Sequence, residues 1–182
     1  MSGRMGMAVA EQVLQAQDLN LAVATVRANN PMLGKKLLNS NLQIASSFAD
    51  TKIDVLIDFT LPAGVMQHLE YCLQNKVAMV IGSTGFNEQQ LNTIKQAATK
   101  IPIVKSSNMS VGVNICYKLL ATAAKMFDSN WDISIVDVHH KHKKDSPSGT
   151  AKEMAQVLAT SSGKLLDEIN IYSERQGETI GE

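Results

Sequence analysis

The sequence is short of cysteine, of aromatic residues and of net charge, and each shortage excludes a class of protein. Its 182 residues contain 17 Lys plus Arg and 17 Asp plus Glu, so no global field draws the chain to nucleic acid or to an anionic membrane. No apolar run approaches the roughly 20 residues that span a bilayer, and no secretory segment begins the chain. We therefore expect a soluble protein without a nucleic-acid or membrane partner.

The two cysteines, Cys72 and Cys116, both fall inside apolar helical patterns. This usage is typical of a reducing compartment, so we expect a cytoplasmic location. Cys116 as a nucleophile is one alternative, but a cysteine in such a pattern more often packs as a small buried hydrophobe. The chain is long enough for one large or two small domains with a core.

Strand-like and helix-like patterns alternate along the first part of the chain. Short β-branched or apolar runs predict strands at residues 21–26, 53–59, 77–81 and 101–104, with 53–59 buried. Residues 28–41, which contain Asn-Asn-Pro and Gly34, read as a loop. This order predicts an α/β fold with a parallel sheet, whose ligands gather where the strands end.

Four polar residues are candidates for helix N-caps: Thr60 before Pro62, Asn87 in Asn87-x-x-Gln90, Ser110, and Thr150 in Thr150-x-x-Glu153. The helix that Ser110 opens carries apolar residues inward, Cys116 among them, and is expected to end near residues 128–130. Residues 169–172 are strand-like. We place a domain boundary close to Ser110, which divides the chain into residues 1–110 and 111–182.

The start of the chain resembles half of a dinucleotide-binding fingerprint. Gly3-x-x-Gly6 opens a helix, where backbone amides can hold a pyrophosphate, although an ordinary glycine-containing helix start is as plausible. Arg27 follows the strand predicted at 21–26, so it suits a 2′-phosphate and NADPH, or is simply solvated. Polar turns at 82–85 and 106–108 follow other strands and read as either a cofactor cleft or connectors.

The most distinctive stretch is the basic run, residues 139–144, in which six consecutive side chains are His or Lys. A strand at 133–138 precedes it, and period-two alternation places His139 on the face of Asp137. A turn at 146–149 follows and leads into a helix, whose free amides beside these cations make an anion site. The pattern favours a small, doubly negative substrate that meets a proton donor.

Three other interpretations compete for the basic run. It could be a solvated loop. Its histidines could bind a metal, but the neighbouring lysines repel a cation and we predict no metal site. A nucleic-acid patch would carry interleaved aromatic residues and net positive charge, and both are absent here.

Residues 139–151, His-His-Lys-His-Lys-Lys-Asp-Ser-Pro-Ser-Gly-Thr-Ala, closely resemble the signature of the 4-hydroxy-tetrahydrodipicolinate reductase (dihydrodipicolinate reductase) family of lysine and diaminopimelate biosynthesis. Residues 3–6, 57–60, 82–86 and 108–114 support the resemblance in the right order. The similarity covers essentially the whole chain.

The resemblance implies a Rossmann-type N-terminal domain for NADPH or NADH, and a mixed α/β C-terminal domain that binds substrate and builds a homotetramer. It implies hydride transfer to a cyclic, unsaturated dicarboxylate together with proton delivery. In this reading His139 is the proton donor and Lys143 the second catalytic base or donor. His140 binds substrate, and Gly149 with Thr150 forms a carboxylate clamp.

Eleven residues fall at the family's cofactor-contact positions. They are Gly3, Arg4, Met5, Arg27, Gly82, Ser83, Thr84, Ser106, Ser107, Asn108 and Met109. Val26 stands where an acidic ribose contact is usual, which leaves Arg27 to favour NADPH. Ser83 replaces a usual threonine, and Met109 a frequent aromatic residue.

Family members usually have a strand before Gly3 and continue past Glu182. We therefore expect that the chain is truncated at both ends and that the substrate domain is incomplete. The alternative function is a fragment of the same fold that binds weakly and turns over little.

Overall fold

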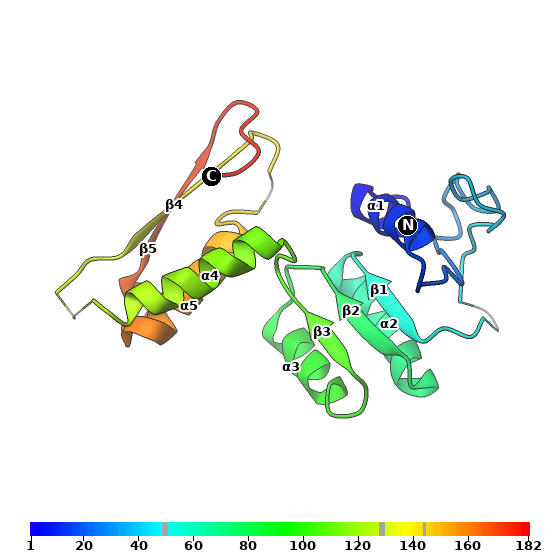
Figure 1. Ribbon diagram of the computed structural model, residues 1–182, viewed down its shortest axis with the longest axis horizontal. Helices are drawn as coiled ribbons and strands as arrows, with labels where there is room; N and C mark the ends of the chain where they lie inside the picture. Colours follow the sequence, from blue (N-terminus) through cyan, green and yellow to red (C-terminus); the bar gives the residue numbers. More distant parts are fainter. Residues whose placement is uncertain (49–50, 128–129, 144) are drawn as a thin grey trace. The chain divides into compact units, whose positions relative to one another are not determined.

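The computed structural model describes residues 1–48, 51–127, 130–143 and 145–182, which form two compact units, Met1–Lys105 and Ser106–Glu182. Figure 1 traces both units along the chain. Each contains a parallel sheet with helices, which confirms the predicted α/β class. Lys144 of the basic run, and residues 128–129 at the predicted end of the long helix, lie outside the described residues.

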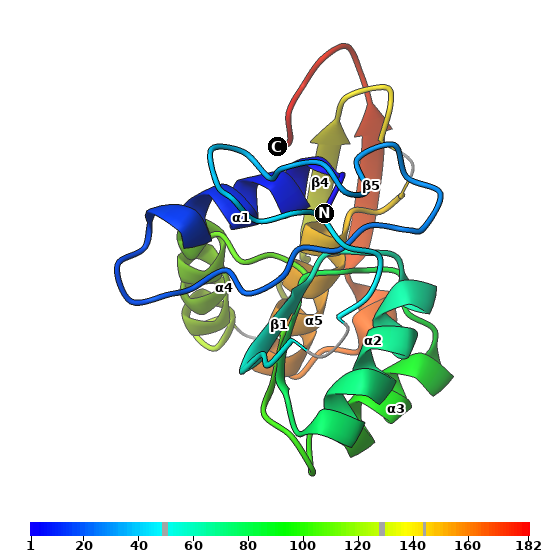
Figure 2. The same ribbon diagram turned by 90° about the vertical axis from the view of Figure 1, so that its right-hand side faces the viewer.

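The first unit is built on a three-stranded parallel sheet in the order β1 (Val55–Asp58), β2 (Ala78–Ile81) and β3 (Ile103–Lys105). The connecting helices α2 (Pro62–Asn75) and α3 (Glu88–Ala97) lie side by side against the sheet (Figures 1 and 2). Their apolar stripes and β2 share one core, made of Val65, Leu69, Cys72, Val77, Met79, Ile81, Ile94, Ala97 and Ile101. The strands predicted at 53–59, 77–81 and 101–104 are thus confirmed, with somewhat different ends.

The prediction that the first of these strands is buried is wrong for one of its faces. Val55 is 51% exposed and Ile57 is 42% exposed, while Asp58 points into the unit. The strands follow one another across the sheet in the order β1, β2, β3. Because crossovers between parallel strands are right-handed, this order places both connecting helices, α2 and α3, on the same face of the sheet. The uncovered side borders a cavity of about 1070 Å³, which Val55 and Ile57 line.

The strand predicted at residues 21–26 is also wrong. This segment makes one isolated parallel bridge, Thr25 with Ala45, through hydrogen bonds from the Val26 and Ala45 amides. With a partner at only one residue, no ladder can propagate along it. The segment packs instead with α1 (Arg4–Gln15) in a second small core of Ala10, Ala24, Val26, Leu37 and Ile44. Residues 28–41 form the predicted loop.

Two of the four predicted helix caps are confirmed. Asn87 and Gln90 make the complete capping box of α3, and the Ser110 hydroxyl accepts from the Val113 amide at the start of α4 (Val111–Ala124). Thr60 is not a cap, because its amide donates back to Asp58 Oδ1 and α2 begins after Leu61.

Thr150 does not cap its helix either. Helix α5 (Gly149–Ser162) begins two residues earlier than that prediction requires, because the Ser148 hydroxyl accepts from the Ala151 amide at 3.1 Å. Thr150 therefore lies inside the first turn of α5. This places its side chain beside the free amides of the helix start.

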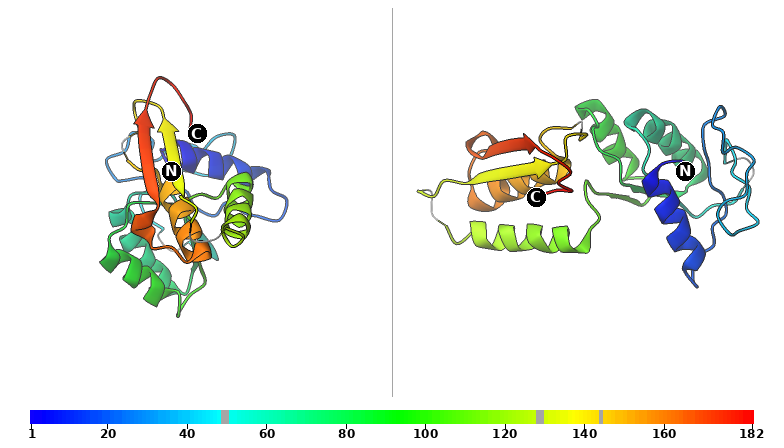
Figure 3. Two further views of the ribbon diagram at one scale, coloured as in Figure 1. Left: turned by 90° about the vertical axis from the view of Figure 1, so that its left-hand side faces the viewer. Right: turned by 90° about the horizontal axis from the view of Figure 1, so that it is seen from above.

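The second unit pairs β4 (Ser134–His139) in parallel with β5 (Asn170–Arg175), which follows a 3₁₀ turn at Leu166–Glu168. Helix α5 packs on this two-stranded sheet and α4 runs alongside α5 (Figure 3). Their shared core consists of Ala124, Ala155, Leu158, Ala159 and Ile169, with Ile135 and Ile171 beneath. On the other face of the sheet, Val136 and Tyr172 are each 57% exposed.

The two cysteines differ in burial. Cys72 is completely buried in α2, as predicted, whereas Cys116 is exposed. The prediction for Cys116 is wrong because α4 turns its Tyr117 and Ala124 side inward, about 100° away on the helix. Among the described residues, no helix combines the length and the apolar character needed to cross a bilayer.

Candidate active site

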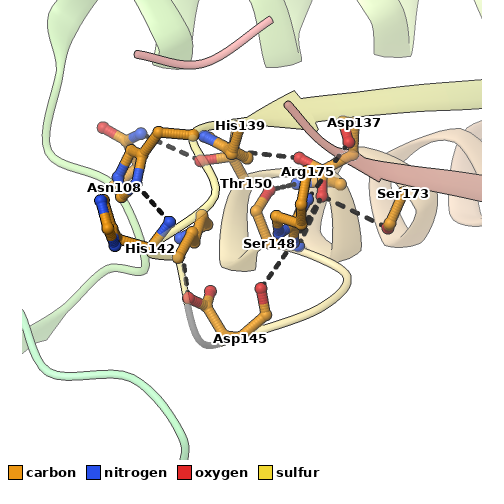
Figure 4. Close-up of polar contacts among 12 residues, drawn as sticks. Asn108, Asp137, His139, His142, Asp145, Ser148, Thr150, Ser173 and Arg175 are labelled. Carbon is orange, nitrogen blue, oxygen red and sulfur yellow. Dashed lines mark hydrogen bonds and ion pairs between the residues drawn. The ribbon is translucent and has the colours of Figure 1, made fainter. Parts of the chain in front are cut away.

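The basic run starts where β4 ends, beside a buried carboxylate. Asp137 is 3% exposed, and its Oδ1 lies 3.0 Å from His139 Nε2 (Figure 4). Because the two residues are separated by one position on the strand, they point to the same face, as the alternation predicts. The other ring nitrogen, His139 Nδ1, lies 3.1 Å from the Ile180 carbonyl oxygen.

The second oxygen of Asp137 reaches the helix that follows the basic run. Asp137 Oδ2 accepts from the Ser148 amide at 2.9 Å, and Ser148 is the N-cap of α5. Burial alone would raise the pKa of Asp137, but the Ser148 hydrogen bonds and the His139 and Arg175 charges hold it below its usual value. The carboxylate is therefore an anion at neutral pH, and it joins the end of β4 to the start of α5.

The start of α5 carries the two predicted clamp residues, Gly149 and Thr150. Its first amides have no partner within the helix, and the helix dipole favours an anion there. Asn108 Nδ2 donates to Thr150 Oγ1 at 3.1 Å (Figure 4), while Asn108 Oδ1 accepts from the Ser110 amide at 2.9 Å. The structure thus brings a predicted cofactor residue into contact with a predicted substrate residue.

Two further hydroxyl groups lie close to Thr150. The Tyr117 and Ser107 hydroxyls are buried near it without a well-formed hydrogen bond. Burial raises the pKa of Tyr117, although the neighbouring Thr150 and Ser107 hydroxyls oppose this shift. Thr150 therefore has two buried, neutral hydroxyl groups beside it. The remaining predicted residues of this loop are Ser106, whose hydroxyl donates to the Asn108 carbonyl, and Met109, which is 40% exposed.

Lys143 lies on the other side of the turn after β4. Its Nζ is 2.8 Å from Asp145 Oδ1, and the Lys143 side chain is 22% exposed. Partial burial would raise the pKa of Asp145, but the hydrogen bond and charge of Lys143 hold it below its usual value. Arg175 Nη2 donates to the Asp145 carbonyl at 2.6 Å and lies 3.5 Å from Asp137 Oδ2. Arg175 therefore ties β5 to both the turn and the buried carboxylate.

His140 is fixed by its own turn. Its Nδ1 accepts from the His142 amide at 3.2 Å, which leaves Nε2–H as a donor. His140 lies just beyond β4, which ends at His139, and its hydrogen bond is to this turn, whereas His139 contacts Asp137 and the Ile180 carbonyl. Among the described residues, no group of three His, Cys, Asp or Glu side chains could hold a metal ion.

In the first unit, Gly3, Arg4, Met5 and Arg27 all line the cavity of about 1070 Å³. Gly3 is the N-cap of α1, and nothing lies within 4 Å of the place where its Cβ would be, so a ligand can approach the backbone. The helix start, the open backbone and the arginine fit the phosphates of a dinucleotide.

Gly82, Ser83 and Thr84 follow β2 and do not line this cavity. They lie against its rim, because the Ser83 hydroxyl donates to the Thr60 carbonyl at 2.5 Å and Thr60 is a lining residue. A Cβ on Gly82 would lie 2.0 Å from the Phe59 ring, so any larger residue here would force that ring to move. The turn after β1 is held in place by Asp58, whose Oδ1 accepts from the Thr60 amide at 2.7 Å.

Four polar residues that shape these sites were not among the predicted site residues: Asp58, His68, Asp137 and Arg175. Strand alternation in the sequence already indicates that Asp137 lies beside His139. Nothing in the sequence indicates that Asp137 also binds the Ser148 amide. Arg175 is the register partner of His139 across the β4–β5 pair, which no local pattern reveals. In the first unit, Asp58 is 2% exposed and its Oδ2 lies 2.6 Å from His68 Nδ1 on α2. The contact of Asp58 with His68 and the contact of Asp137 with Ser148 both depend on where a helix packs.

Comparison with known proteins shows the family to which the chain belongs. The family described as "Dihydrodipicolinate reductase, N-terminus" matches residues 1–109, and "Dihydrodipicolinate reductase, C-terminus" matches residues 112–182. The 4-hydroxy-tetrahydrodipicolinate reductase of Nitrosomonas eutropha is 42% identical over 99% of this chain and 72% of its own length. That of Nitrosospira multiformis is 44% identical over 98% of this chain and 68% of its own length.

A solved structure is similar throughout. The dipicolinate-bound dihydrodipicolinate reductase from Paenisporosarcina sp. TG-14 superimposes with a TM-score of 0.73 at 27% identity, over 99% of this chain and 77% of that one. These matches favour neither a nucleic-acid-binding module nor an inactive fragment.

Proposed function

Because the chain belongs to the dihydrodipicolinate reductase family, NAD(P)H-dependent enzymes of lysine and diaminopimelate biosynthesis, we propose that His139 and Lys143 supply the protons of its reaction. The observation that supports this most directly is the placement of His139 beside the start of α5, through their common contact with Asp137. A cationic donor and a set of anion-binding amides then lie in one site. This is the arrangement that a dicarboxylate substrate requires.

We assign the carboxylate-binding role to Gly149 and Thr150, with His140 as a further donor. The free amides of the first turn of α5 bind one substrate carboxylate, and the Thr150 hydroxyl is oriented by Asn108. Lys143 balances the second negative charge and is released from Asp145 when substrate binds. The bound nicotinamide supplies the hydride, and these side chains orient the substrate and deliver the proton.

For the cofactor we propose NADPH in preference to NADH. Gly3, Arg4 and Met5 at the start of α1 would hold the pyrophosphate, and Arg27 would pair with the 2′-phosphate. Gly82, Ser83 and Thr84, with Ser106 to Met109, complete the proposed contacts. We accordingly propose that residues 1–110 form the cofactor-binding domain and residues 111–182 the substrate-binding domain.

We also propose a homotetramer and a cytoplasmic location. The outer face of the β4–β5 pair exposes Val136 and Tyr172, which a second copy of the chain would cover. Val136→Lys should lower the molecular mass seen by analytical ultracentrifugation. An unchanged mass would place the subunit contact elsewhere. The two free thiols suit a reducing compartment.

The test of the catalytic assignment is steady-state reduction of enzymatically generated substrate, followed by the loss of reduced-nicotinamide absorbance. His139→Gln should lower kcat by about 10²- to 10⁴-fold, the usual contribution of a positioned general acid, with a smaller change in KM. Lys141→Ala is the matched control, because Lys141 belongs to the same run but its side chain is 61% exposed and forms an ion pair with Glu178, which is itself exposed. Equal kcat values for His139→Gln and the unaltered protein would refute the assignment.

A further inference from the structure

The Asp137 carboxylate contacts three elements of the second unit at once. On β4 it meets His139 Nε2 at 3.0 Å, and at the start of α5 it accepts from the Ser148 amide at 2.9 Å. On β5 it lies 3.5 Å from Arg175 Nη2 and accepts from the Ser173 hydroxyl at 3.4 Å. Together with the Ser148 hydroxyl, these are the charged and polar groups of the described residues that face it, and with 3% exposure it has little contact with solvent.

The surroundings of His139 distinguish its two ring nitrogens. Both nitrogens face oxygen atoms that can only accept, Asp137 Oδ1 and the Ile180 carbonyl. The doubly protonated ring satisfies both contacts. Of the two protons, the one on Nε2 is held by a buried anion and the one on Nδ1 by a neutral carbonyl, so Nδ1–H is the weaker held and the one that a substrate can take by displacing the Ile180 carbonyl.

We propose that Asp137 is a positioning residue for the reduction: it holds the Nε2–H of His139 so that Nδ1 is the donor atom, and it keeps the donor in register with the first turn of α5. This rests on the proposed role of His139 as proton donor. Asp137 is 3% exposed, so in this proposal it acts through His139.

The proton-transfer step follows from this geometry. The hydride adds to the unsaturated substrate, and the displaced electron pair collects on an acceptor atom of the ring. That atom takes the proton from His139 Nδ1, where the N–H bond breaks and its electron pair stays on the nitrogen. The His139 imidazole is left neutral, with its remaining proton on Nε2 already hydrogen-bonded to Asp137. No rotation of the imidazole is needed before or after transfer.

An asparagine at position 137 cannot reproduce these contacts, although it has the same shape. Its single carbonyl oxygen can accept from the Ser148 amide or from His139 Nε2, and the amide nitrogen then opposes the other donor. If the oxygen keeps Ser148, the His139 Nε2 must lose its proton, and the neutral ring carries its proton on Nδ1. The Nδ1 proton then belongs to a neutral imidazole, which is a far weaker acid than the doubly protonated ring, so its transfer to the substrate is slow.

Steady-state kinetics separate this role from a structural one. We expect Asp137→Asn to lower kcat by about 100-fold, the effect of a small misplacement of a reacting group, with KM within a few-fold of the original. Asp137→Glu retains both carboxylate oxygens and should recover much of this loss. Ser173→Ala removes only the long contact at 3.4 Å and should leave kcat unchanged.

Two measurements make the proposal falsifiable even for poorly stable variants. Nitrogen-15 NMR of the imidazole should show Nε2 protonated in the original protein and unprotonated in Asp137→Asn. In the double variant with His139→Gln, Asp137→Asn should cause no further loss of kcat, because both changes remove the same donor. An unaltered tautomer, or losses that multiply, would overturn the proposal.

Failure of the proposed function gives a different result. If His139→Gln turns over normally, the donor assignment itself is wrong. If His139→Gln is impaired while Asp137→Asn is normal, only the role of Asp137 is wrong.

Discussion

Asp58 should stabilise the first unit at neutral pH, and Asp58→Asn removes its charge without changing its shape. The carboxylate is 2% exposed at the end of β1. Its Oδ1 accepts from the Thr60 amide at 2.7 Å, and its Oδ2 lies 2.6 Å from His68 Nδ1. These two contacts hold the turn between β1 and α2 and attach it to the second turn of α2.

The magnitude follows from the two hydrogen bonds. A hydrogen bond to a charged group contributes roughly 1.5–3 kcal/mol, against roughly 0.5–1.5 kcal/mol for a neutral one. Asparagine can keep both contacts but makes them neutral, so each loses about 1–1.5 kcal/mol. We therefore expect the free energy of unfolding of the first unit to fall by about 2–3 kcal/mol at pH 7.

The difference should disappear in acid. Burial would raise the pKa of Asp58, but the hydrogen bonds from His68 and Thr60 and the His68 charge bring it below the ordinary value of 3.8. A lowered carboxyl pKa stabilises the folded state fully above the unfolded value, and this stabilisation is lost as pH falls through the folded pKa. The original protein should thus approach the variant in stability only below pH 3.8.

The assay is urea unfolding at pH 7, 5 and 3, followed by circular dichroism. Fluorescence of Trp131, the one tryptophan, reports the second unit separately and should not change. Asp54→Asn is the matched control, because Asp54 lies just before the same strand but is exposed. Equal destabilisation at pH 7 and pH 3, or an equal effect of Asp54→Asn, would refute the reasoning.

Three other outcomes can be measured directly. Arg27→Ala should raise the KM for NADPH by about 10- to 100-fold, the cost of a lost charged hydrogen bond, and should raise the KM for NADH far less. Equal increases in the two KM values would mean that Arg27 does not contact the 2′-phosphate. Burial raises the pKa of Cys72 to about 11, so iodoacetamide at pH 8 should modify the exposed Cys116 of the folded protein and spare Cys72. Mass spectrometry identifies the labelled cysteine, and rapid labelling of Cys72 would contradict its burial. Leu158→Ala should cost about 2–5 kcal/mol in urea unfolding followed by Trp131 fluorescence, and a loss below about 1 kcal/mol would show that this core collapses around the gap.

Local patterns were sufficient for most of the elements. The apolar spacing predicted β1 to β4 and their helices, and the capping box of Asn87 was identified by its two polar residues alone. The basic run indicated an anion site because six adjacent cationic or titratable side chains have no place in a core. These signals are local, since side-chain periodicity and capping depend only on residues a few positions apart.

Competing local choices were not decided by the sequence. Thr60 and Thr150 both have the composition of an N-cap, yet Thr60 bonds back to Asp58 and Ser148 starts α5 in place of Thr150. Residues 21–26 have strand composition but only one bridging partner. A strand needs a neighbour along its length, and sequence propensity does not supply one.

The sequence by itself determined which residue types are available: the imidazole, the lysines and the helix start that follow one another over residues 139–150. Only the tertiary structure decided that a buried carboxylate joins them. Asp137 meets Ser148 across 11 residues and Arg175 across 38 residues, from three different elements. Such contacts arise when helices and strands pack to bury apolar surface, and packing alone determines which polar groups then lie together.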